Sequence, residues 1–138
     1  MDVSIASEVE EPMSIEEFKT KWLHYLEVCN QKNMDLADRL TDELMKTDCF
    51  FHVPGWPDLQ QGTAGQKASM REWVANNPDF HITVNDVLLV GDKMIVRWTL
   101  QLNNPTTRAV EISAGLEIDR IAEGKFAECW ALLVPGKW

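Results

Sequence analysis

Residues 112–130 constrain the fold of this chain more than any other stretch of the sequence. They predict two strands joined by a tight turn at Glu123-Gly124, because the first strand alternates between apolar and mainly polar or small residues with a period of two. One face of that strand carries Ile112, Ala114, Leu116 and Ile118, and the other carries Ser113, Gly115, Glu117 and Asp119. Burying a carboxylate is costly unless it is neutral or paired, so Glu117 is the first residue that needs an explanation.

The remainder of the chain predicts helices first and strands afterwards. A first helix begins after Ser14, with Glu17 at the capping-box position, and a second runs to Leu44 or Met45. A third helix is expected from a cap at Thr63 to about Asn76. The expected strands cover residues 49–53, 80–90, 94–102, 109–121 and 126–134. This order predicts an α+β domain in which helices cover one face of a curved antiparallel sheet.

Composition and charge narrow the class of protein. The 138 residues, 45% of them hydrophobic, predict one domain over 14–138, preceded by a flexible acidic tail over 1–13. A net charge of −9 argues against nucleic acid or an anionic membrane as the main partner. With no signal-peptide pattern and no long apolar run, we expect a soluble, cytoplasmic protein. Its three scattered cysteines predict buried thiols. No metal or redox cofactor is implied.

Three short segments resemble a known superfamily. They are FFHVPGWPDLQQGTAG, LLVGDKMIVRWTL and GLEIDRIAEGKFAECW. Together with the order of elements they resemble the nuclear transport factor 2-like superfamily, and within it the SnoaL-like polyketide cyclases and the ketosteroid isomerases. The resemblance spans roughly residues 14–134. It implies a cone-shaped α+β fold whose curved sheet wraps around the helices, and it implies a homodimer.

The resemblance to ketosteroid isomerases also implies a catalytic group. Tyr25 matches a tyrosine on the first helix, and His52 lies within about one residue of the position of the catalytic base. Glu117, three residues before Arg120, matches the carboxylic acid that donates to the substrate oxygen. His52 would then remove a proton α to a carbonyl, while Tyr25 and protonated Glu117 stabilise the enolate oxygen. Ala131 departs from the SnoaL pattern, which usually has an acid–base Asp directly after the tryptophan of the last strand.

We therefore predict a cofactor-independent isomerase or cyclase, or a dehydratase built from the same parts. Its substrate would be a hydrophobic carbonyl compound, polyketide- or terpenoid-like. An apolar cavity suits such a ligand, and the residues expected to line it are Trp22, Trp56, Trp73, Trp98 and Cys129. Asp119 is expected at the rim, Glu128 on the outer face, and Arg97 pointing away from the cavity.

Two alternatives remain open at this stage. A shift of one residue in strand register would turn Glu117 to the surface. Independently of that shift, the structural alternative for Tyr25 is a core aromatic, and for His52 it is a strand-end residue bonded to a neighbouring carbonyl. The same fold would also suit a non-catalytic module that binds a small ligand, or that dimerises through outward-facing Ile112, Leu116 and Ile118.

Overall fold

Three helices and five strands make up the part of the chain that the computed structural model describes, residues 11–138. Most of the expected tail over 1–13 lies outside the described residues. The elements are, in chain order, α2 (Ile15–Asn30), α3 (Met34–Leu44), β1 (Met45–His52), α4 (Gly62–Asn76), β2 (His81–Val90), β3 (Lys93–Asn103), β4 (Val110–Ala122) and β5 (Lys125–Pro135). Within this range no helix is long and apolar enough to cross a membrane.

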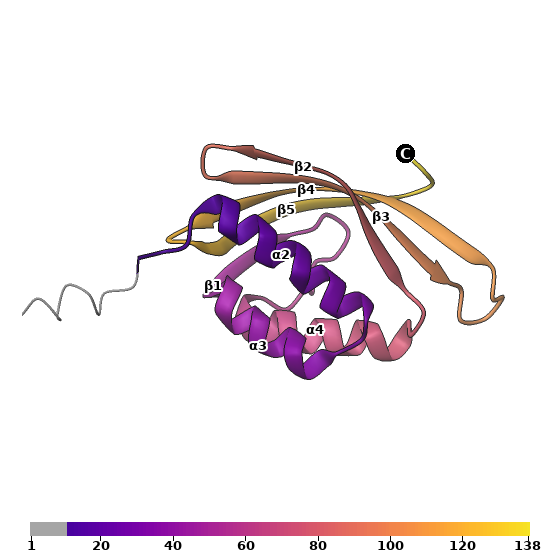
Figure 1. Ribbon diagram of the computed structural model, residues 1–138. Coiled ribbons are helices and arrows are strands. Elements are labelled where there is room, and N and C mark those ends of the chain that lie inside the picture. The colour runs from indigo at the N-terminus through magenta and orange to yellow at the C-terminus, as the bar shows by residue number, and fades with distance from the viewer. Residues whose placement is uncertain (1–10) are drawn as a thin grey trace, which may run out of the picture.

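The strands form one curved sheet in the order β1-β5-β4-β3-β2. Strands β2 to β5 are an antiparallel meander, and β1 pairs with β5 in parallel. Figure 1 shows the three helices gathered on one side of this sheet. The predicted α+β class and the predicted meander are confirmed.

The register of β4 decides which way Glu117 faces. Glu117 lies opposite Val96 of β3 and Ala131 of β5, and Val96 is fully buried. The β4–β5 turn is the expected one, because Glu123 and Gly124 both have positive φ, as a two-residue type I′ hairpin turn requires. Glu117 therefore points to the concave, helix-covered face, and the register shift does not occur.

Aromatic side chains join α2 to this concave face. Trp22 stacks on Tyr25 at 5.3 Å and on Phe126 of β5 at 5.4 Å between ring centroids. The start of α2 is the predicted one, because the Ser14 hydroxyl accepts a hydrogen bond of 3.1 Å from the Glu17 backbone N–H. These stacked rings form a packed aromatic core next to the β4–β5 turn, and we call this end of the cone its closed end.

The connection from β1 to α4 differs from the prediction. Thr63 does not cap α4, because the helix already begins at Gly62 with Gln61 as its N-cap residue. The Gln61 side chain is engaged elsewhere: its amide bonds the backbone N–H and C=O of Phe51, at 2.7 and 3.0 Å. The side-chain amide thus takes the place of a neighbouring strand, because it pairs with backbone hydrogen-bonding groups at the edge of β1. The strand itself begins at Met45, four residues before the predicted start at Cys49.

Candidate functional site

An apolar cavity of about 300 Å³ lies between the concave face of the sheet, α4 and the loop over 53–61. Its volume is at the lower end of the range for small-molecule sites. Three of the tryptophans predicted to form its wall, Trp56, Trp73 and Trp98, do line it. Trp98 lies against Gly115, where an added Cβ would come within 2.3 Å of the indole ring. Glycine at 115 therefore leaves room for that ring on the sheet.

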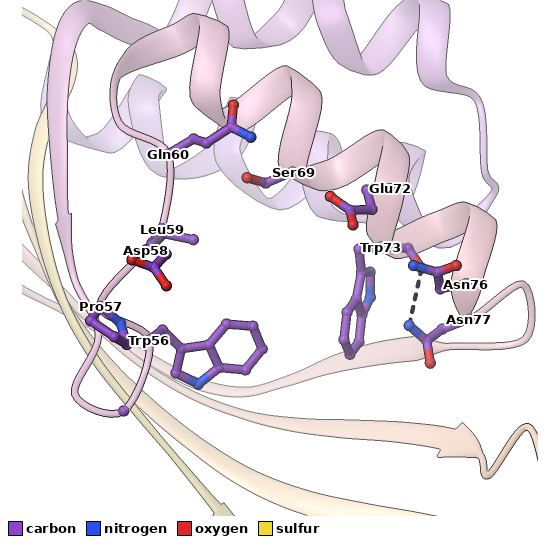
Figure 2. Close-up of a pocket in the computed structure, with 11 residues that line it drawn as sticks. Trp56, Pro57, Asp58, Leu59, Gln60, Ser69, Glu72, Trp73, Asn76 and Asn77 are labelled. Atoms are coloured by element: carbon purple, nitrogen blue, oxygen red, sulfur yellow. Dashed lines mark hydrogen bonds between the residues drawn. The ribbon is translucent and has the colours of Figure 1, made fainter.

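A second, more polar hollow of about 490 Å³ adjoins this cavity and shares part of its wall. We call the first the inner cavity and the second the mouth. Figure 2 shows the mouth between the loop and α4, with the indoles of Trp56 and Trp73 standing on either side of one space. Its polar lining residues are Asp58, Gln60, Ser69, Glu72, Asn76 and Asn77.

Glu117 lies on the concave face of β4, opposite a residue that lines the inner cavity. Its cross-strand neighbour Ala131 lines that cavity, and paired strands are only about 5 Å apart. Glu117 is half-buried, whereas Asp119, two residues further along the same face, is fully buried. Glu117 itself is not among the residues that line the inner cavity or the mouth, so it neighbours the inner cavity through Ala131.

Glu117, Asp119 and Cys129 form an acidic cluster in which their carboxylate and thiol atoms lie within 4.8 Å of one another. The Cys129 thiol donates to Glu117 Oε2 at 3.6 Å. Within residues 11–138 neither carboxylate oxygen of Asp119 has a hydrogen-bond partner. Burial, and then the nearby Glu117 carboxylate, raise the pKa of Asp119 well above its ordinary value. Asp119 is therefore the neutral acid of the pair.

The prediction that Asp119 lies at the rim is wrong. Strand alternation puts it on the same face as Glu117, but one row nearer the closed end of the cone, opposite Met94 and Cys129. Met94 is completely buried and Cys129 is 4% exposed. Burial and the neighbouring carboxylates also raise the pKa of the Cys129 thiol, which therefore keeps its proton.

Tyr25 reaches the inner cavity only through another residue. Its side chain is 1% exposed, and its hydroxyl accepts a hydrogen bond of 2.9 Å from Gln66 Nε2. Gln66, on α4, lines the inner cavity. Burial raises the pKa of Tyr25, so the phenol stays neutral. Gln66 is thus the polar group that connects Tyr25 with the cavity.

His52 lies on the opposite, convex face of the sheet. Its ring stacks on Trp130 with 5.4 Å between centroids, and its Nε2 lies 2.7 Å from Glu128 Oε2. Glu128, on the outer face as predicted, also pairs with Arg120 at 3.2 Å, and these contacts lower its pKa. Phe51, the preceding residue, points inward and lines the cavity. The structure therefore places Tyr25 and Glu117 on the inner side and His52 outside.

Comparison with known proteins agrees with this architecture. The sequence pattern of the SnoaL-like polyketide cyclases matches residues 21–133. The chain belongs to this family. No curated protein sequence matches it.

Solved structures of similar shape come from several bacteria. TsrD from Streptomyces laurentii has a TM-score of 0.71 and 21% identity, with 88% of this chain and 90% of that one covered. IdmH from Streptomyces antibioticus, described as a proposed polyketide cyclase, has a TM-score of 0.70 and 20% identity over 84% and 91%. AclR from Streptomyces galilaeus, described as a proposed hydroxylase, has a TM-score of 0.68 and 17% identity over 88% and 81%. At these identities the likeness shows the fold.

This SnoaL-like chain brings together a different set of residues from the expected one. Trp22 and Cys129 are not among the residues that line the inner cavity; Trp22 is in the aromatic core and Cys129 in the acidic cluster. The position of Gln66 at the cavity could not be predicted from the sequence, because an isolated amide on a helix carries no distinctive signal. The inward position of Asp119 could have been predicted, because residues two apart in a strand lie on the same face and Asp119 follows Glu117 by two.

Proposed function

We propose that this SnoaL-like protein catalyses a cofactor-independent isomerisation or cyclisation of a hydrophobic carbonyl compound, polyketide- or terpenoid-like. One observation supports the proposal most: half-buried Glu117 lies opposite Ala131, which lines the apolar cavity, and a carboxylate oxygen of Glu117 is within 4.8 Å of a carboxyl oxygen of the buried, neutral Asp119. A carboxylate with a neutral acid beside it can take up a proton and return it without leaving an unpaired buried charge.

The proposed reaction begins with the Glu117 carboxylate. It removes the proton from the carbon α to the substrate carbonyl, and the C–H electron pair moves to form an enolate. Gln66 donates one N–H to Tyr25, which leaves its second N–H free to donate to the enolate oxygen. In cyclisation the enolate carbon attacks a second carbonyl of the same molecule, and Glu117 returns the proton to the alkoxide oxygen that forms. In isomerisation Glu117 returns the proton to another carbon of a conjugated enolate. Tyr25 is thus a positioning residue for Gln66.

Exchange of α-protons in heavy water tests this proposal without knowledge of the natural substrate. Bicyclic ketones of a size that suits the inner cavity are expected to lose their α-proton NMR signal faster with the protein than in buffer alone. Binding is measured in parallel through quenching of tryptophan fluorescence, since Trp56, Trp73 and Trp98 line the cavity. Ketones that bind but exchange no faster than in buffer would contradict catalysis, and would favour a module that only binds ligands.

We further propose that the protein is a homodimer joined through the convex face. That face exposes large apolar side chains at 38–58% of their area: Leu116, Ile118, Trp130, Leu132 and Val134. A contiguous apolar surface of this kind favours association. Strand β4 is the middle strand of the five, so Leu116 lies well inside the sheet.

Leu116→Lys is expected to convert the dimer to monomer, because it puts a charge into a buried apolar contact. Sedimentation equilibrium should give the mass of two chains for the wild type and of one for the variant. Val90→Lys is the matched control, because Val90 is 60% exposed but ends the edge strand β2. A wild-type protein that sediments as one chain would overturn the dimer.

A further inference from the structure

The mouth combines aromatic walls with negative charge. Trp56 comes from the loop and is 51% exposed, and Trp73 comes from α4. Figure 2 shows the carboxylates of Asp58 and Glu72 in the same view, on the loop side and the helix side of the space between the indoles. The residues that line the mouth include no lysine or arginine.

The basic residues of α4 are engaged on another side of the helix. Lys67 pairs with Asp42 of α3 at 2.6 Å. Arg71 pairs with Asp38 of α3 at 2.8 Å. Among residues 11–138, neither Asp58 nor Glu72 takes part in a salt bridge, and both are exposed. The two carboxylates of the mouth are therefore not neutralised by the protein's own cations.

We propose that the mouth binds a cationic group of the substrate, an alkylated ammonium. This inference rests on the proposed function, because it assigns one end of the molecule whose other end reacts in the inner cavity. An ammonium carrying alkyl groups is attracted to the faces of indole rings, and its methyl groups cover their apolar surface. Two carboxylates beside those rings add a favourable charge interaction and disfavour an anion.

The arrangement of the two hollows makes a single molecule the natural occupant of both. Trp56 and Trp73 belong to the wall of the inner cavity as well as to the mouth. A ligand whose ring system fills the apolar inner cavity would therefore reach the two indoles at its outer end. A short arm on that ring system would then place the cationic group in the mouth. The substrate class that fits is a hydrophobic carbonyl compound with a basic amine at the end remote from the reacting carbon.

A matched pair of ligands tests this inference. Two naphthyl ketones are compared by titration of tryptophan fluorescence, one with a trimethylammonium group on a short arm and the other with a neutral tert-butyl group of the same shape. The cationic ketone is expected to bind about tenfold more tightly at low salt, and the preference should decline as salt screens the carboxylates. The double variant Asp58→Asn/Glu72→Gln should lose most of the preference while its affinity for the neutral ketone stays unchanged.

The control variant removes two negative charges at positions outside the mouth. Glu16→Gln/Asp48→Asn changes two exposed carboxylates on α2 and β1, and it is expected to keep the preference. Equal affinity of the wild type for both ketones would overturn the cationic substrate and leave the proposed function standing. A preference that survives in the mouth variant would also overturn it. If neither ketone binds, the failure lies with the inner cavity and hence with the proposed function itself.

Discussion

Glu117→Gln is expected to slow α-proton exchange by at least about 100-fold, the usual contribution of a positioned general base. Glutamine keeps the shape and the hydrogen-bonding reach of the side chain but cannot accept a proton. The binding of the ketone should therefore change little while the exchange rate falls. The measurement is the rate of signal loss in heavy water at saturating ketone, with the affinity taken from the fluorescence titration.

His52→Ala is the matched control for this prediction. His52 lies on the convex face, bonded to Glu128 and stacked on Trp130, so its removal is expected to leave the exchange rate close to that of the wild type. The reverse result, a slow His52→Ala variant and an active Glu117→Gln variant, would contradict the proposed mechanism. It would instead support His52 as the general base, as the resemblance to ketosteroid isomerases implied.

The pairing of β4 with β5 could be predicted because two local signals agree. Alternation along residues 112–119 separates an apolar face from a face with Glu117, and Glu123-Gly124 supplies the two positive φ angles of a two-residue hairpin turn. Once the turn is fixed, the pairing of β4 with β5 follows, and a slip of one residue would break both patterns. These signals predict the hairpin, but they do not say which of its faces is concave; the inward position of Glu117 was predicted only from the resemblance to the ketosteroid isomerases.

The side on which His52 lies could not be predicted in the same way. Its strand is short, and its partner β5 is parallel and more than 70 residues away, with His52 opposite Trp130. Which face of β1 meets the core depends on that distant pairing and on how Gln61 bonds Phe51. Phe51 and Val53, which flank His52 and line the inner cavity, were the only local indication that the imidazole points outward.

The tryptophans show a similar limit. Composition predicted an aromatic cavity, and Trp56, Trp73 and Trp98 line it. Trp22 has the same residue type on an apolar helix face, yet it packs against Phe126 in the closed end of the cone. Helical periodicity identifies a buried face, but only the position along the cone decides whether that face meets a core or a cavity.

Asp119→Asn is expected to remove a pH dependence from the stability of the folded protein. In the unfolded chain Asp119 loses its proton near its ordinary pKa of 3.8, whereas burial keeps the proton on the folded protein to a much higher pH. Between these two values the folded state binds one more proton than the unfolded state. Raising the pH through this window therefore favours unfolding, by up to about 1.4 kcal/mol per pH unit. Below pH 3.8 the contribution of Asp119 to stability is fully present.

Urea unfolding between pH 4 and 9 measures this effect. The free energy of unfolding of the wild type should fall more steeply with rising pH than that of Asp119→Asn, because asparagine has no proton to lose. Asp48→Asn, which changes an exposed carboxylate on β1, should keep the wild-type slope. Equal slopes for the wild type and Asp119→Asn would show that Asp119 is ionised in the folded protein, and would contradict the neutral acid.

The two predictions meet in one variant. The charge of Glu117 is the second cause of the raised pKa of Asp119, after burial. Glu117→Gln removes that charge, so it is expected to lower the folded pKa of Asp119 and to end the pH-dependent loss of stability at a lower pH. A variant that loses proton exchange and also shortens this window would show that both carboxyl groups share one proton-binding site. Loss of exchange with an unchanged window would show that Glu117 acts independently of Asp119.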